Sequence, residues 1–278
     1  MSNLPPPVLT LPPTTTIQPE RLRNLVVALI FASAVCFGML AVRALVSSKV
    51  ESLGFFGNLL LAWIPLLLAW AICCLLDQGA IASDRRGSTL GVLEAISPRA
   101  LQPRVGGSAG NGGRELRTAR PWMIAALFIL WFLFFPNAPY IVTDLVHLKT
   151  RPPVPRWFDY ILMIEHAITG LFLMYLSLTL LHAPVRERWG ATRGWLFVFT
   201  MLSAASLGVY VGRFFRWNSW DVILRPGKPA RDLGRFFQED TVIQTLFFCS
   251  AFLALLAMVY LVLHALAHLH ARDSREDV

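Results

Sequence analysis

Residues 122–148 read WMIAALFILWFLFFPNAPYIVTDLVHL, and this stretch decides the fold class. Its first 14 residues are apolar, but a helix of that length covers only about 21 Å of a hydrocarbon core that is about 30 Å thick. Pro136 and Pro139 then interrupt the helical hydrogen bonds, and a second apolar piece follows from Ile141 to Leu148. Irregular backbone at this depth is tolerated only inside protein or beside a water-filled cavity. The stretch therefore predicts a transmembrane helix that is broken at Pro136–Pro139.

Five further apolar runs accompany this broken element, at 24–46, 55–76, 158–181, 195–212 and 241–266. A run of about 20 such residues spans a bilayer. Only 15 % of the 278 residues are charged, whereas a typical soluble domain has about 25 %. These numbers exclude a soluble enzyme, a disulfide scaffold and a disordered chain. We predict an all-α fold, a polytopic transmembrane helix bundle of about six spans with the lipid bilayer as its partner.

The broken element leaves two topologies open. If it crosses the membrane, the bundle has six spans and both termini lie on one side. If it re-enters and returns, there are five spans, and Lys and Arg concentrate more strongly on one side, as the positive-inside rule favours. We prefer six, because an extended Pro-Asn-Ala-Pro-Tyr linker supplies the missing length. In both topologies the segments 149–157 and 213–240 lie on the same face.

The bundle is expected to occupy residues 21–270. Before it, residues 1–20 are rich in Pro and Thr and predict a disordered tail. Within it, the Arg-rich stretch 77–120 contains a Gly-rich segment at 106–113, which predicts a flexible loop. Residues 271–278 are expected to form a short polar tail.

The formal net charge of +8 has its source in the loops. Lys and Arg hold the cytoplasmic loops of membrane proteins in place, so we predict no nucleic-acid partner. The four cysteines lie inside apolar runs without metal-ligand spacing, and they are expected to act as small packing residues.

The piece that follows the break carries the first candidate site. Tyr140, Asp144 and His147 are spaced to share one face of a helix. An Asp/His pair at this spacing can bind a metal, or the carboxylate can orient the imidazole for general base chemistry. Asn137 is placed to cap the piece or to contact a substrate. The alternative is an interfacial half-helix whose polar face meets water.

The fourth span begins near Asp159 and carries Glu165 and His166 about two turns deeper. Ionisable groups inside a membrane are costly and are functional candidates. Asp159 is the third candidate ligand of a divalent metal, together with Asp144 and His147. The alternative is a buried pair that another helix satisfies.

The string GRFFRWNSWD at 212–221 follows the fifth span. Arg213 and Arg216 are one turn apart, so both guanidinium groups can converge on a phosphate or a carboxylate. Arginines above an aromatic belt are the ordinary alternative. The other polar and aromatic candidates of this string are Asn218, Ser219 and Trp220 as substrate contacts and Asp221 as a catalytic group.

Gly208 and Gly212 form a small-residue pattern in the fifth span. Such a pattern lets a second backbone approach closely, either within this bundle or in a homodimer. The later histidines His264 and His268 fit polar residues at a helix end better than metal ligands.

Four parts of the sequence resemble an uncharacterised family of bacterial polytopic membrane proteins, a domain of unknown function. They are FPNAPYIVTDLVHL at 135–148, WFD at 157–159, Gly170 and GRFFRWNSWD at 212–221. The resemblance covers about residues 120–265 and implies a multi-pass protein of the bacterial cytoplasmic membrane, without an activity. Glu165 and His166 are not in the family pattern. The pattern maps onto Asn137, Pro139, Tyr140, Thr143, Asp144, His147, Asp159, Arg213, Arg216, Asn218, Ser219, Trp220 and Asp221.

Three functions remain open at this stage. The first is a membrane enzyme for an anionic or lipid-linked substrate, with Asp144, His147 and Asp221 in catalysis and the two arginines as an anion clamp. The second is a small transporter or channel, because such proteins place their sites at broken helices. The third is a structural or assembly subunit in which the same charges form buried ion pairs. No nucleophile elbow, phosphate loop or HExxH motif distinguishes them.

Overall fold

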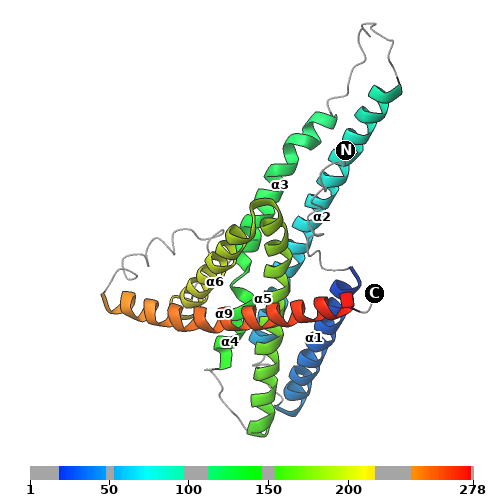
Figure 1. The fold of residues 1–278 in the computed structure, drawn as a ribbon. Coiled ribbons are helices and arrows are strands. Elements are labelled where there is room, and N and C mark those ends of the chain that lie inside the picture. The colour runs from blue at the N-terminus through cyan, green and yellow to red at the C-terminus, as the bar shows by residue number, and fades with distance from the viewer. Residues whose placement is uncertain (1–18, 48–52, 97–111, 146–153, 217–238, 277–278) are drawn as a thin grey trace.

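The computed structural model describes residues 19–47, 53–96, 112–145, 154–216 and 239–276, and the regular structure in these ranges is helical (Figure 1). The helices are α1 (Pro19–Ser47), α2 (Leu53–Ile96), α3 (Gly112–Phe134), α4 (Asn137–Asp144), α5 (Arg156–Trp189), α6 (Ala191–Phe214) and α9 (Glu239–Glu276).

Six stretches of the described helices are long and apolar enough to cross a membrane, which confirms an all-α bundle with six candidate spans. The third of them, Pro121–Asp144, combines the end of α3 with all of α4. The predicted break is present, because α3 ends at Phe134 and α4 begins at Asn137. Helices α1, α2, α4 and α6 all contact α5, which lies at the centre of the bundle.

The break differs from the extended linker that the sequence suggested. Pro136 has helical backbone angles, and the amide of Tyr140 donates to its carbonyl at 3.0 Å. Pro139 is tolerated in the first turn of α4, where amide groups have no partner inside the helix. The prediction that Asn137 caps α4 is wrong, since Pro136 holds the cap position and Asn137 is already helical. The missing length comes from α4 itself, which continues the span to Asp144.

Two glycines let neighbouring helices approach the break. A Cβ atom on Gly170 of α5 would lie 2.5 Å from the carbonyl oxygen of Ala138. A Cβ atom on Gly208 of α6 would lie 2.6 Å from Cγ of Pro136. Gly208 therefore packs inside its own chain, and a homodimer through Gly208 and Gly212 stays a prediction.

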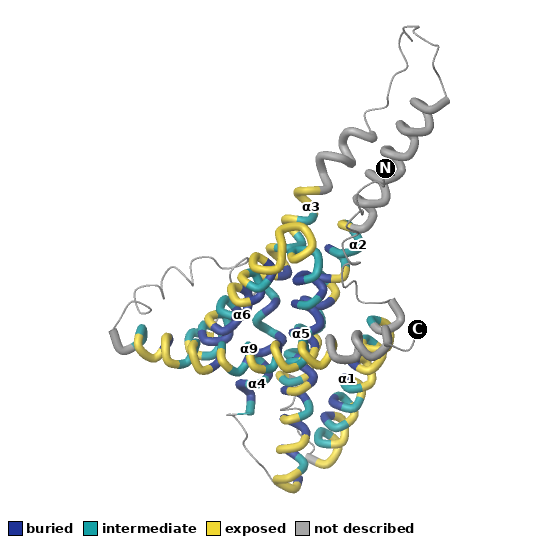
Figure 2. The backbone as a smooth tube through the Cα atoms, in the orientation of Figure 1, coloured by how far each residue is buried: buried dark blue, intermediate teal, exposed yellow. Residues whose placement is uncertain are grey.

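Buried residues concentrate along α5, while exposed residues lie on the outside of the bundle (Figure 2). Trp131 of α3 is fully buried and donates from Nε1 to Ser177 Oγ at 2.8 Å. On the outside, Phe31 is 70 % exposed and Phe247 is 80 % exposed. An apolar outer surface of this kind suits a protein that has lipid as its solvent. Helix α9 lies across α6 and α5 (Figure 1).

The loop predicted over 77–120 is shorter than expected, because α2 runs to Ile96 and α3 begins at Gly112. No proline interrupts the chain between Pro65 and Pro98, so the helix continues past the apolar run and ends just before Pro98. Residues 97–111 and 1–18 lie outside the described residues. The predicted C-terminal tail is helical to Glu276.

Candidate functional site

Five helix ends meet on one side of the bundle and carry the polar residues of the candidate site. If the six candidate spans cross the membrane in turn, the end of α1, the start of α2, the end of α4, the start of α5 and the end of α6 lie on one side. These ends contribute Arg43, Asn58, Asp144, Asp159 and Arg213, in chain order. They bring two arginines and two aspartates to one end of the bundle.

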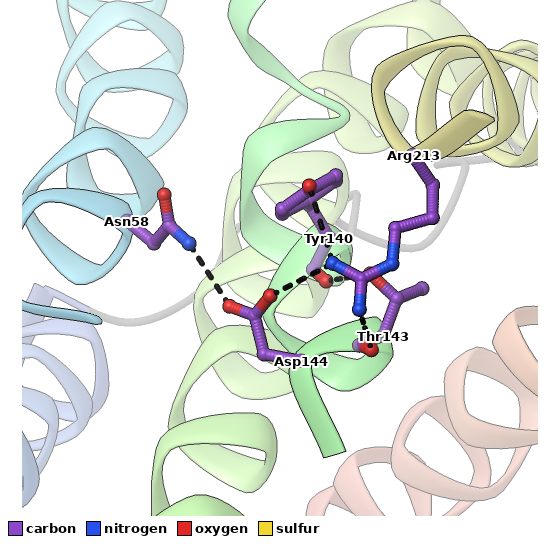
Figure 3. Close-up of polar contacts among 5 residues, drawn as sticks. All are labelled: Asn58, Tyr140, Thr143, Asp144 and Arg213. Carbon is purple, nitrogen blue, oxygen red and sulfur yellow. Dashed lines mark hydrogen bonds and ion pairs between the residues drawn. The ribbon is translucent and has the colours of Figure 1, made fainter. Parts of the chain in front are cut away.

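Asp144, the last residue of α4, is at the centre of the first group (Figure 3). The residue as a whole is only 8 % exposed. Oδ2 accepts a hydrogen bond from Nδ2 of Asn58 on α2 at 2.9 Å, and Oδ1 lies 3.3 Å from Nη1 of Arg213 on α6. Helices α2, α4 and α6 therefore meet at one carboxylate.

Arg213 also binds the last turn of α4. Its Nη2 donates to the carbonyl oxygen of Thr143 at 2.8 Å, and its Nη1 lies 3.4 Å from the Tyr140 hydroxyl. The guanidinium carbon is 5.9 Å from the centre of the Tyr140 ring. The last carbonyl groups of a helix lack partners within the helix and attract a cation. We call Asn58, Tyr140, Thr143, Asp144 and Arg213 the Arg213 cluster.

Asp159 belongs to a different ion pair, with Arg43 of α1. Nε of Arg43 donates to Oδ1 at 2.6 Å and Nη2 donates to Oδ2 at 3.2 Å, so the contact is bidentate. Asp159 is 3 % exposed. Paired, parallel hydrogen bonds of this kind are the strong form of an arginine–carboxylate contact. The pair joins α1 to α5 and uses both oxygens of the carboxylate.

The contact between Arg213 and Asp144 is less tight. A single guanidinium nitrogen reaches Asp144, at 3.3 Å, whereas two nitrogens of Arg43 reach Asp159. Both side chains of the Arg213–Asp144 pair keep some exposure, 15 % for Arg213 and 12 % for Asp144. The Arg213 cluster thus combines a cation, a carboxylate, a phenol and an amide at the edge of the bundle.

Within the described residues, no group of three or more His, Cys, Asp and Glu side chains is placed to hold a metal ion. Asp144 and Asp159 each accept hydrogen bonds from an arginine instead. His147 lies outside the described residues, so a metal at Asp144, His147 and Asp159 stays a prediction.

The structure brings Tyr140, Asp144 and Arg213 together, as the shared face of 149–157 and 213–240 requires. Arg216 is exposed just beyond α6, with a positive φ of 53°. Asn137 is half-buried at the start of α4. The predicted residues that lie outside the described ranges are His147, Asn218, Ser219, Trp220 and Asp221.

Sequence reasoning missed Asn58 and Arg43. Asn58 is the single polar residue of the run 55–76 and Arg43 is the single charged residue of the run 24–46, and that isolation is the signal that marks each. Nothing in the sequence of α1 or α2 indicates which residue of α4 or α5 either one meets.

The sequence profile of one family matches residues 110–259, from α3 into α9. Its description is "Protein of unknown function (DUF1361)". The chain belongs to the DUF1361 family. No curated protein and no solved structure matches the chain. The match includes Tyr140, Asp144 and Arg213, whereas Asn58 lies outside it. The DUF1361 region therefore supplies most of the Arg213 cluster, and α2 completes it.

Proposed function

We propose that this DUF1361 protein is a membrane-embedded enzyme that acts on an anionic, lipid-linked substrate at the Arg213 cluster. One observation carries the proposal: Arg213 and Asp144 lie 3.3 Å apart at the end of a broken span, beside the hydroxyl of Tyr140. A cation that binds an anion and a carboxylate that moves a proton are two of the parts that such an enzyme needs.

Arg213 is the group that binds the substrate anion. A phosphate or carboxylate group offers a guanidinium two oxygens, which is a better partner than the single oxygen of Asp144 that Arg213 contacts. The substrate therefore competes with Asp144 for Nη1 of Arg213. The contact from Nη2 to the Thr143 carbonyl holds the guanidinium in place during this exchange.

Asp144 is the group that exchanges a proton with the substrate. Once the anion is bound to Arg213, the Asp144 carboxylate keeps its hydrogen bond from Asn58 at 2.9 Å, so the carboxylate stays in place. A general base must be held within hydrogen-bond reach of the proton that it takes. Binding of the anion and release of the base are then one event.

The location of the cluster favours a substrate with a chain in the bilayer. Phe214, next to Arg213, is 46 % exposed on the outside of the bundle. Its ring centre is 5.5 Å from that of Phe248 on α9. A headgroup at Arg213 thus has apolar surface beside it on which an acyl or prenyl chain can pack.

Arg213→Lys and Asp144→Asn test this function against a panel of membrane lipids and lipid-linked phosphates. Lys keeps the charge but loses the planar fork, and Asn removes the base, so each variant should lose activity about 100-fold or more. Arg43→Lys is the matched control: it alters the other arginine–aspartate pair at the same face and should retain activity. Wild-type rates in both cluster variants, at normal expression, would falsify the proposal.

The broken span supports a second candidate, a small transporter. Transporters place their substrate sites at interrupted helices, and α4 is enclosed by α5 and α6 at Gly170 and Gly208. Uptake of an anion into proteoliposomes, lost in Arg213→Lys without turnover of any lipid, would favour this function over the enzyme.

A further inference from the structure

Two ionisable neighbours lie inside the bundle, apart from the Arg213 cluster. Glu165 and His166 belong to α5, about 10 Å of helix rise from Asp159 towards the membrane interior. His166 is 1 % exposed and Glu165 is half-buried. Ionisable side chains at this depth are rare and mark pathways or proton sites when they occur.

The hydrogen bonds of His166 define its tautomer. Nδ1 lies 2.7 Å from the carbonyl oxygen of Leu162, which can only accept, so Nδ1 carries the hydrogen. Nε2 of the neutral ring then has a lone pair directed into the protein. Within the described residues this buried atom has no hydrogen-bond partner, and the same is true of Oε2 of Glu165. Two neighbouring side chains thus each present a buried atom that can accept a proton.

Within the described residues, the helices around Glu165 and His166 place no oppositely charged side chain in contact with either of them. On α1, Cys36 Sγ lies 3.7 Å from Thr169 Oγ1, one turn from Glu165. On α2, the ring of Phe55 meets the edge of the His166 ring at 6.3 Å between centres. Asp159 of α5 pairs with Arg43 and Asp144 of α4 pairs with Arg213, while His182 of α5 contacts the Tyr260 hydroxyl of α9.

We propose that Glu165 and His166 form a proton-binding pair in the membrane interior. The proton is the ligand that fits, because both unpartnered atoms are acceptors. The layer beside them is apolar and consists of Leu40, Leu162 and Met163 with Phe55 against it. A proton on the carboxyl group leaves both side chains neutral, and a second proton on Nε2 makes the pair a cation. Because charges interact more strongly in an apolar layer than in water, protonation of one group changes the proton affinity of its neighbour, independently of any substrate at the Arg213 cluster.

Infrared spectroscopy of the full chain in phosphatidylcholine nanodiscs tests the pair. The carbonyl band of a protonated carboxyl group should be present in the wild-type chain and lost in Glu165→Gln. Glu187→Gln, which changes an exposed carboxylate at the end of the same helix, should retain it. His166→Gln should shift the pH at which the band disappears by about one pH unit or more, because coupled groups titrate as a pair.

Two results overturn the proposal: a wild-type chain with no band that depends on Glu165 at neutral pH, or a folded His166→Gln variant with an unchanged midpoint. If His166→Gln does not fold, the wild-type chain labelled with ¹⁵N-histidine decides. One of its imidazoles must change protonation over the same pH range as the carboxyl band. The absence of any such imidazole contradicts the pair.

Discussion

At the scale of single residues, two arginine–aspartate pairs at one membrane face have different geometry. Arg43 uses two nitrogens on both oxygens of Asp159, whereas one nitrogen of Arg213 reaches Asp144. The second oxygen of Asp144 accepts from Asn58. The first pair connects α1 to α5, and the second connects α4 to α6. Under the proposed function, Asn58 is the residue that holds the carboxylate in place when Arg213 binds an anion.

We expect Asn58→Leu to lower the free energy of unfolding by about 1–3 kcal/mol, because it leaves Oδ2 of a buried carboxylate without its donor. The effect should depend on Asp144. In a double-mutant cycle with Asp144→Asn, measured by denaturant unfolding in detergent, the two changes should couple by about 0.5–3 kcal/mol. The matched cycle uses Ser203→Ala, a half-buried residue whose hydroxyl donates within α6 to the carbonyl oxygen of Phe199, and should be additive. Additivity with Asp144→Asn would contradict the assigned contact.

At the scale of elements, α4 is held in place from two sides. Gly170 of α5 lies against the backbone of Ala138, and Gly208 of α6 lies against Pro136. The backbone of α4 can approach both helices because these positions have no side chain. The last turn of α4 then presents Asp144 and the Thr143 carbonyl to Arg213. The position of the cluster thus depends on the close packing around the break.

Gly170→Ala should destabilise the protein by about 1–3 kcal/mol, since the added methyl group would overlap a backbone oxygen that cannot rotate away. Gly38→Ala is the matched control: a Cβ atom there meets nothing within 4 Å, and alanine is favoured over glycine in a helix by about 1 kcal/mol. The free energies of unfolding of the two variants are measured in the same detergent and compared. A stable Gly170→Ala variant with unchanged activity would refute the role of this contact.

At the scale of the whole molecule, the features that can be predicted from the sequence are those that a local pattern of residues determines. Apolar runs predict the six candidate spans, and Pro136 and Pro139 locate the break, because both signals act on their own segment. The alternation of spans predicts that the segments after Asp144 and from Arg213 onward lie on the same face, and the contact between Asp144 and Arg213 is consistent with it. The partners Asn58 and Arg43 were not predictable, since one polar residue in an apolar run does not indicate its contact. The helical conformation of the break was missed because proline at a cap position allows a helix to resume at once.

The central claim is that Arg213 binds an anion while Arg43 serves the structure. Isothermal titration of a short-chain phosphatidic acid into the purified full chain, the Arg213→Lys variant and the Arg43→Lys variant tests it most directly. We expect equal affinity for the wild-type chain and Arg43→Lys, and affinity at least about tenfold weaker for Arg213→Lys, which corresponds to about 1.4 kcal/mol. Equal affinity in Arg213→Lys, or an equal loss in both variants, would contradict it.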